Sequence, residues 1–157
     1  MDSLKNQIEL PLLNLPDYNP ELYRNDDKLW VFDPIRKKQL VLTPEEWVRQ
    51  HWINFLIQHQ NYPKGLFALE RGLKYNQLQK RTDLVIWDKM GDPYLLIECK
   101  APSVTLSQKT MEQACVYHQE LKSPHLIISN GNQHIFMSYD SKLNLFHQER
   151  DCPKAPN

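Results

Sequence analysis

Two apolar runs separated by a short turn constrain the fold of this chain more than any other feature. The runs "TDLVIW" and "YLLIECK" flank "DKMGDP", and apolar runs bounded by Gly and Pro are typical of paired strands. An antiparallel hairpin with Trp87 opposite Tyr94 sets Asp83 opposite Glu98, with Cβ atoms about 5 Å apart. A slip of one residue would instead move Asp83 to the other face of the sheet.

The length and composition indicate one folded domain that meets its partners through local surfaces. The 157 residues are 41% hydrophobic, and 19 Lys and Arg balance 19 Asp and Glu. A neutral chain has no global attraction to nucleic acid or to anionic membranes, so a polyanion must be met by a local patch. Widely spaced Cys99, Cys115 and Cys152 favour free thiols. With no signal peptide or membrane span apparent, we expect a cytoplasmic protein.

The remaining patterns predict an α/β sandwich with a mixed sheet. Thr43, Pro44 and Glu46 mark a helix start with a capping box. Asn130-Gly131 indicates a turn between the last two strands of the core. We expect an N-terminal arm and short hairpin over residues 1–42 that pack on the core, a core over residues 43–148 and a tail over residues 149–157. The hairpin comprises strands 29–32 and 39–42. The core comprises, in chain order, helix 43–58, strands 65–73, 82–87 and 94–100, helix 106–121, and strands 125–129 and 134–139.

Glu98 and Lys100 stand two residues apart at the end of a strand, so both point to one face while Cys99 points to the other. Opposed carboxylates at Asp83 and Glu98 repel unless one is protonated or a cation lies between them. Mg²⁺ suits carboxylate oxygens, waters and a backbone carbonyl such as that of Cys99. Lys100 would then hold or deprotonate a water whose pKa the metal lowers. This set predicts metal-dependent phosphodiester hydrolysis, although Glu98 and Lys100 also fit a solvated ion pair at a sheet edge.

The two helices add further candidates. Gln113 and Tyr117 are four residues apart and share a helix face, where an amide and a phenol meet one ligand. Glu46 stands with Arg49 at the start of the first helix, within reach of a site on the sheet. The capping box explains Glu46 without catalysis, and Glu45 lies nearer the apolar stripe of that helix, so the choice between the two acids stays open.

The ordered series E-x-x-R from Glu46, "KRTD", "LLIECKAP", Q-x-x-x-Y from Gln113 and "ISNG" resembles the N-terminal nuclease domain of type I restriction endonuclease R subunits, within the PD-(D/E)XK nuclease superfamily. The likeness covers about residues 43–139, with Thr82 where the superfamily name has proline. It implies a restriction-endonuclease-like αβββαββ core, with a central mixed sheet flanked by helices, that cleaves DNA with Mg²⁺ or, as a substitute, Mn²⁺.

The resemblance also implies a role for each candidate residue. Asp83 and Glu98 would be metal ligands together with the Cys99 carbonyl, and Lys100 would position or activate water. Glu46 would be a further acid at the metal site, and Gln113 and Tyr117 would contact the nucleic acid.

The sequence contains no Walker A glycine loop. We therefore expect no ATP use, and either partner subunits from a restriction-modification or motor assembly or a free-standing nuclease. The leading hypothesis is a metal-dependent deoxyribonuclease. A non-catalytic module that binds nucleic acid or a partner subunit is the second, and a purely structural domain in which the carboxylates pair with Lys and Arg is the third.

Overall fold

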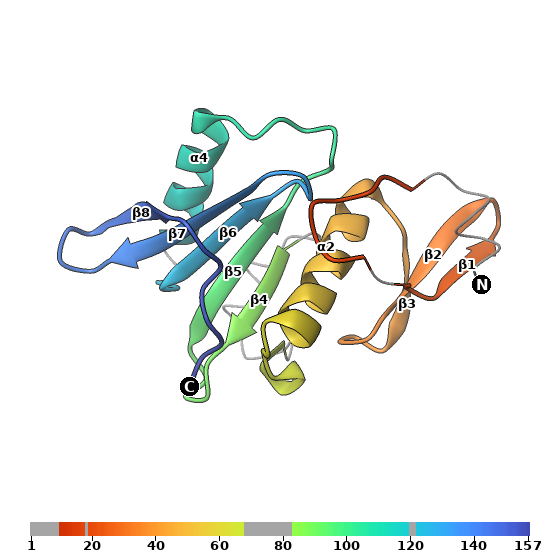
Figure 1. Cartoon of the computed structure of the whole chain (residues 1–157), viewed down its shortest axis with the longest axis horizontal. Coiled ribbons are helices and arrows are strands. Elements are labelled where there is room, and N and C mark those ends of the chain that lie inside the picture. The colour runs from red at the N-terminus through yellow and green to blue at the C-terminus, as the bar shows by residue number, and fades with distance from the viewer. Residues whose placement is uncertain (1–9, 18, 68–82, 120–121) are drawn as a thin grey trace.

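The computed structural model describes residues 10–17, 19–67, 83–119 and 122–157; the side chains at 83 and 116–119 are not described. These residues form a mixed α/β structure with a three-stranded sheet and a five-stranded mixed sheet (Figure 1). The small sheet, in the order β1-β2-β3, comprises β1 (Leu22–Asn25), β2 (Lys28–Asp33) and β3 (Lys38–Val41). The large sheet, in the order β4-β5-β6-β7-β8, comprises β4 (Asp83–Trp87), β5 (Pro93–Cys99), β6 (His125–Ser129), β7 (His134–Asp140) and β8 (Leu145–Glu149).

Two helices cover opposite faces of the large sheet. Helix α2 (Pro44–Asn54) lies between the two sheets in Figure 1 and continues into a π-helical turn, η1 (Phe55–His59). Helix α4 (Gln108–Gln119) precedes β6, which pairs in parallel with β5, whereas the other neighbouring strands pair antiparallel. None of the helices in the described ranges is long and apolar enough to cross a membrane.

The alternation of side chains along β5 distributes them between two cores. Ile97 and Cys99 pack with Trp52 of α2 in one core. Leu96 packs with Ala114 of α4 in the other. Successive residues of a strand point to opposite faces, so the face of β5 that carries Leu96 also carries Glu98, next to α4 rather than α2.

Local sequence sets the start of α2 as predicted. The Thr43 hydroxyl accepts a hydrogen bond from the Glu46 amide at 3.1 Å, and Pro44 occupies the first turn. A side-chain cap at this position satisfies one of the backbone donors that a helix start leaves unpaired. The helix begins where the capping pattern places it, although the regular α-helix ends at Asn54 rather than near Gln58.

Three other predictions about the elements need correction. The start of the strand predicted over residues 65–73 is a 3-10 helix, η2 (Lys64–Phe67), because Pro63 begins a turn in which the Leu66 amide bonds the Pro63 carbonyl at 3.1 Å; residues 68–73 lie outside the described chain. The predicted N-terminal hairpin is present as β2 and β3, but β1 adds a third strand. Strand β8 was also missed, because an exposed edge strand has no apolar periodicity.

The N-terminal segment over residues 10–17 is held to the turn between β6 and β7. The Asn14 amide donates to the Gly131 carbonyl at 2.8 Å, and His134 Nε2 lies 2.8 Å from the Asn14 carbonyl. On its other side, His134 Nδ1 lies 2.8 Å from the Ser129 hydroxyl. A neutral ring with its proton on Nε2 satisfies both contacts, since Nδ1 then accepts from Ser129.

This arrangement predicts a loss of stability as the pH falls. Burial lowers the pKa of His134, although its backbone contacts partly oppose the shift. The unfolded chain therefore takes up the proton near pH ~6.5 while the folded chain does not, and the free energy of unfolding decreases as the pH falls through that window. Urea unfolding from about pH 8 to about pH 5 should show this decline, with a weaker slope in His134→Gln. Burial also lowers the pKa of His125, so His125 would account for the pH dependence that remains in His134→Gln. An unchanged slope in His134→Gln would contradict the assignment.

Candidate active site

The hairpin of β4 and β5 sets the register of the candidate site. Asp83 pairs with Glu98, as the sequence predicts, and Leu84 pairs with Ile97. The prediction for the turn end of the hairpin is wrong by one residue, because Trp87 pairs with Pro93 rather than Tyr94 after an irregularity at Ile86 and Trp87. The bulge takes up the extra residue next to the turn, so the register at Asp83 is unaffected.

Glu98 is a buried carboxylate at the end of this hairpin. It is 5% exposed, and its Oε1 atom lies 3.6 Å from Lys100 Nζ. Lys100 remains partly open to solvent, and its amide donates to the Ser129 carbonyl at 2.8 Å, which fixes the strand end beside β6. Residues directly opposite each other in an antiparallel pair lie on one face, so the register brings the positions of Asp83, Glu98 and Lys100 together.

Cys99 lies on the opposite face from its two neighbours. It is 1% exposed and belongs to the core that surrounds Trp52, which confirms the prediction that its side chain is buried packing. Only its backbone carbonyl remains a candidate metal ligand.

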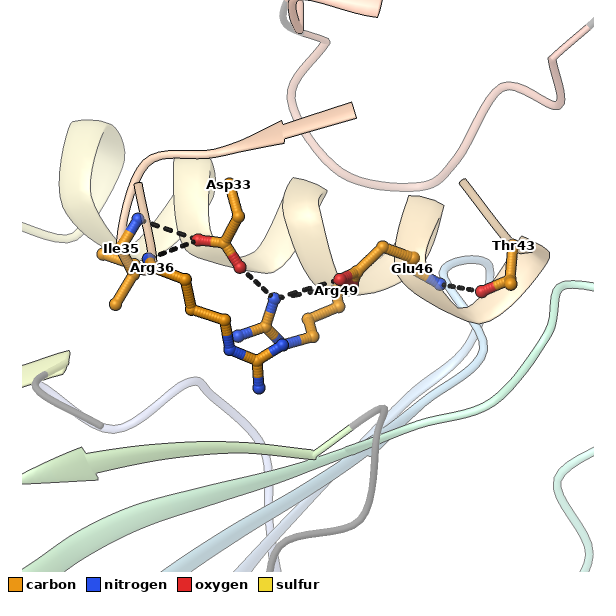
Figure 2. Close-up of polar contacts among 6 residues, drawn as sticks. All are labelled: Asp33, Ile35, Arg36, Thr43, Glu46 and Arg49. Atoms are coloured by element: carbon orange, nitrogen blue, oxygen red, sulfur yellow. Dashed lines mark hydrogen bonds and ion pairs between the residues drawn. The ribbon is translucent and has the colours of Figure 1, made fainter. Parts of the chain in front are cut away.

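Helix α2 contributes a buried ionic group on the other side of the sheet (Figure 2). Arg49 Nη1 lies 2.7 Å from Asp33 Oδ2 and 3.3 Å from Glu46 Oε1. Asp33 Oδ1 also accepts from the amides of Ile35 and Arg36 at 2.8 and 3.1 Å. One carboxylate therefore caps the turn between β2 and β3 and joins that turn to α2.

The pKa values of the two carboxylates around Arg49 shift in opposite directions. Burial favours the protonated form of Asp33, but the Arg49 charge and the hydrogen bonds from Arg49, Arg36 and Ile35 outweigh it and lower the pKa. The pKa of Glu46 is raised, because burial and the negative charge of Asp33 together outweigh the attraction of Arg49. Burial opposes the charge of Arg49, yet Glu46 and Asp33 raise its pKa.

Glu46 also reaches the surface of a pocket of about 820 Å³ at the C-terminal end of β5. Lys100 and Cys99 line the same pocket, as does Glu45. Glu46 and Lys100 therefore line one cavity, but the Glu46 carboxylate is paired with Arg49. Glu45, which is half-buried, remains the alternative acid.

The two residues predicted to hold nucleic acid lie on α4, the helix on the Glu98 face of the sheet. Gln113 is exposed beside Ala114, which packs against the sheet. Tyr117 is helical one turn later, and its side chain lies outside the described atoms. The exposed amide of Gln113 is available to a ligand approaching this face.

Sequence reasoning missed Asp33, which the dipeptide Asp33-Pro34 assigned only to a turn. A buried acid has no periodic signal of its own, and the contact with Arg49 spans 16 positions. The available signal was Arg49 itself, a cation among the residues of α2 that are buried in the fold.

The donor set at the end of β4 and β5 fits a hard divalent cation. Mg²⁺ accepts carboxylate and backbone carbonyl oxygens together with waters, and the opposed positions of Asp83 and Glu98 and the strand-end carbonyl of Cys99 are oxygen donors of this kind. No group of three His, Cys, Asp or Glu side chains that could hold a metal occurs among the described residues, which exclude the Asp83 side chain. Any such site would therefore depend on Asp83 or on backbone and water ligands.

Comparison with known proteins gives a family for most of the chain. The family model described as the type I restriction enzyme R protein N terminus (HSDR_N) matches residues 44–153. No curated protein and no solved structure matches the chain. The match covers α2, the whole large sheet and α4, and begins directly after the small sheet. The chain belongs to the family of type I restriction enzyme R protein N-terminal domains.

Proposed function

We propose that this protein is a Mg²⁺-dependent endonuclease that hydrolyses DNA phosphodiester bonds on a restriction-endonuclease-like core. The observation that carries the proposal is the register of Asp83 opposite Glu98, with Glu98 buried beside Lys100. Family membership supports it, because the family is named for a restriction enzyme subunit. On the same ground we propose that the domain works with other restriction-modification subunits.

In this proposal Asp83, Glu98 and the Cys99 carbonyl hold the cation. Mg²⁺, or Mn²⁺ in its place, would lower the pKa of a coordinated water and neutralise charge on the phosphate. Lys100 orients the attacking water at Nζ, and it accepts the proton of that water after its own ammonium has lost a proton to solvent, for which its partial exposure leaves room.

The helical residues have supporting roles in the proposal. Glu46 contributes a further carboxyl group at the wall of the pocket, acting through water while it remains paired with Arg49. Gln113 and Tyr117 hold the nucleic acid on the α4 side, where the Gln113 amide is exposed.

A cleavage assay tests the proposal. Plasmid and linear DNA should be cut with Mg²⁺ or Mn²⁺ and remain intact in EDTA. Glu98→Gln keeps the size of the side chain but removes the ligand charge, so the rate should fall at least about 100-fold. Calorimetry should show weaker divalent-ion binding in the same variant. Glu21→Gln, at an exposed acid before β1, is the matched control and should cleave normally.

A non-catalytic DNA-binding module is the second candidate, and the pairing of Glu98 with Lys100 favours it. That ion pair balances the buried carboxylate without a metal. The two candidates separate cleanly, because the binding module would bind DNA in EDTA, bind no divalent ion in calorimetry and leave plasmid uncut. Absence of cleavage, or equal cleavage by wild type and Glu98→Gln, would rule out the nuclease.

A further inference from the structure

The pocket at the end of β5 is rich in cations, although the whole chain is neutral. Among the described residues, four basic side chains line it, and the acids that line it are Glu45 and Glu46. The four are Lys28, Arg36, Lys38 and Lys100. Glu46 is paired with Arg49 and Lys100 with Glu98, so Lys28, Arg36 and Lys38 remain against Glu45, and the pocket presents a surplus of positive charge.

Three of these cations come from the small sheet, which precedes the residues matched by the family model. Lys28 begins β2, Arg36 lies in the turn between β2 and β3, and Lys38 begins β3, an edge strand of that sheet. Lys28 and Lys38 are exposed, and Arg36 is half-buried. The fourth, Lys100, belongs to the proposed catalytic set, so the small sheet adds a basic wall beside it.

The buried ionic group fixes this wall relative to the catalytic strand. The Asp33 carboxylate binds the backbone of Arg36 with one oxygen and Arg49 of α2 with the other. Figure 2 shows the Arg36 side chain extending past this contact toward Glu46, and the charge of Arg36 lowers the pKa of Glu46 in opposition to burial. A turn held in this way presents its cations without a large ordering cost on binding.

We propose that Lys28, Arg36 and Lys38 form a phosphate-binding wall that guides a DNA strand to Lys100. Ammonium and guanidinium groups recognise phosphodiester oxygens by charge-assisted hydrogen bonds, and Arg does so with two donors at once. That the bound DNA strand leads to Lys100 rests on the proposed function, in which Lys100 is catalytic. The contacts are to backbone phosphates, so the wall adds affinity without selecting sequence.

The first test measures DNA binding by the full chain in EDTA, where no cleavage occurs. Fluorescence anisotropy with labelled duplex and single-stranded oligonucleotides, titrated with salt, gives affinity and salt slope. The triple variant Lys28→Gln, Arg36→Gln, Lys38→Gln should bind at least about tenfold more weakly, and its slope should flatten by about 2–3. The matched triple Lys89→Gln, Lys122→Gln, Lys142→Gln changes three exposed lysines away from the pocket and should keep the wild-type slope.

Equal weakening in both triples would show a net-charge effect and overturn the proposal, as would a wild type that binds no DNA in EDTA. A thermal melt of the pocket triple near that of wild type confirms that it folds. In the cleavage assay, the pocket triple should raise KM with kcat little changed. If no cleavage occurs but only the pocket triple loses DNA binding, the nuclease proposal fails while the phosphate-binding wall stands.

Discussion

Lys100→Met is expected to slow DNA cleavage by about 100- to 10,000-fold, the usual contribution of a positioned proton-transfer group. Met retains the length of the apolar stem but has no Nζ to orient water or accept a proton. The Lys100 amide would still donate to the Ser129 carbonyl, so the strand end should stay in place. Single-turnover cleavage at saturating Mg²⁺ measures the effect on the chemical step.

Metal binding distinguishes this loss from that of Glu98→Gln. Removing the cation at Lys100 also removes the charge 3.6 Å from Glu98, so divalent-ion affinity in Lys100→Met should be equal to or higher than in wild type. Lys89→Met, at an exposed turn lysine, is the matched control and should cleave normally. A Lys100→Met rate within about threefold of wild type would remove Lys100 from the mechanism.

The register of the site was predictable only to within about one residue. The short turn between β4 and β5 limits the hairpin to a few neighbouring registers, but both faces of the two strands are buried, so the apolar runs do not choose between them. The bulge at Trp87 was not predictable, but it lies at the turn end of the hairpin and leaves the pairing of Asp83 with Glu98 intact.

Long-range polar contacts explain what the sequence did not predict. Asp33 is adjacent to a proline and fits an ordinary turn, yet it is buried against Arg49 on α2. Its partner could be identified only after β2, β3 and α2 had been placed relative to one another. The same limit applies to the pocket cations, since Lys28 and Lys38 are indistinguishable in sequence from solubilising lysines on any surface.

The small sheet and the core are therefore coupled through the ion pair of Arg49 with Asp33, beside the packing of Ile35 against the core. Arg49 is fully buried between Asp33 of β2 and Glu46 of its own helix. Arg36 lies in the turn that Asp33 begins and Lys38 follows that turn, so the position of this part of the basic wall depends on the contact of Asp33 with Arg49. A defect at Arg49 should consequently reduce both stability and DNA binding.

Arg49→Met is expected to destabilise the fold by about 3–5 kcal/mol, because it leaves two buried carboxylates without their cation. Urea unfolding measures the loss, and Arg24→Met, at an exposed position on β1, should change stability little. Adding Asp33→Asn and Glu46→Gln to Arg49→Met removes both uncompensated charges and should restore part of the stability. A loss under about 1 kcal/mol in Arg49→Met would place the group among weak surface pairs.

The pH dependence of the stability of Arg49→Met tests independently whether the lost stability comes from the charge of Arg49. In wild type the pKa of Asp33 is lowered, so its contribution to stability is present above its ordinary value of 3.8 and is lost as the pH falls through the folded value. Without Arg49, burial raises the pKa of both carboxylates in the folded state, and the folded chain then binds more protons than the unfolded one. The deficit of Arg49→Met relative to wild type should therefore shrink as the pH is lowered. A deficit that stays constant with pH would mean that the lost stability comes from packing of the arginine stem rather than from its charge.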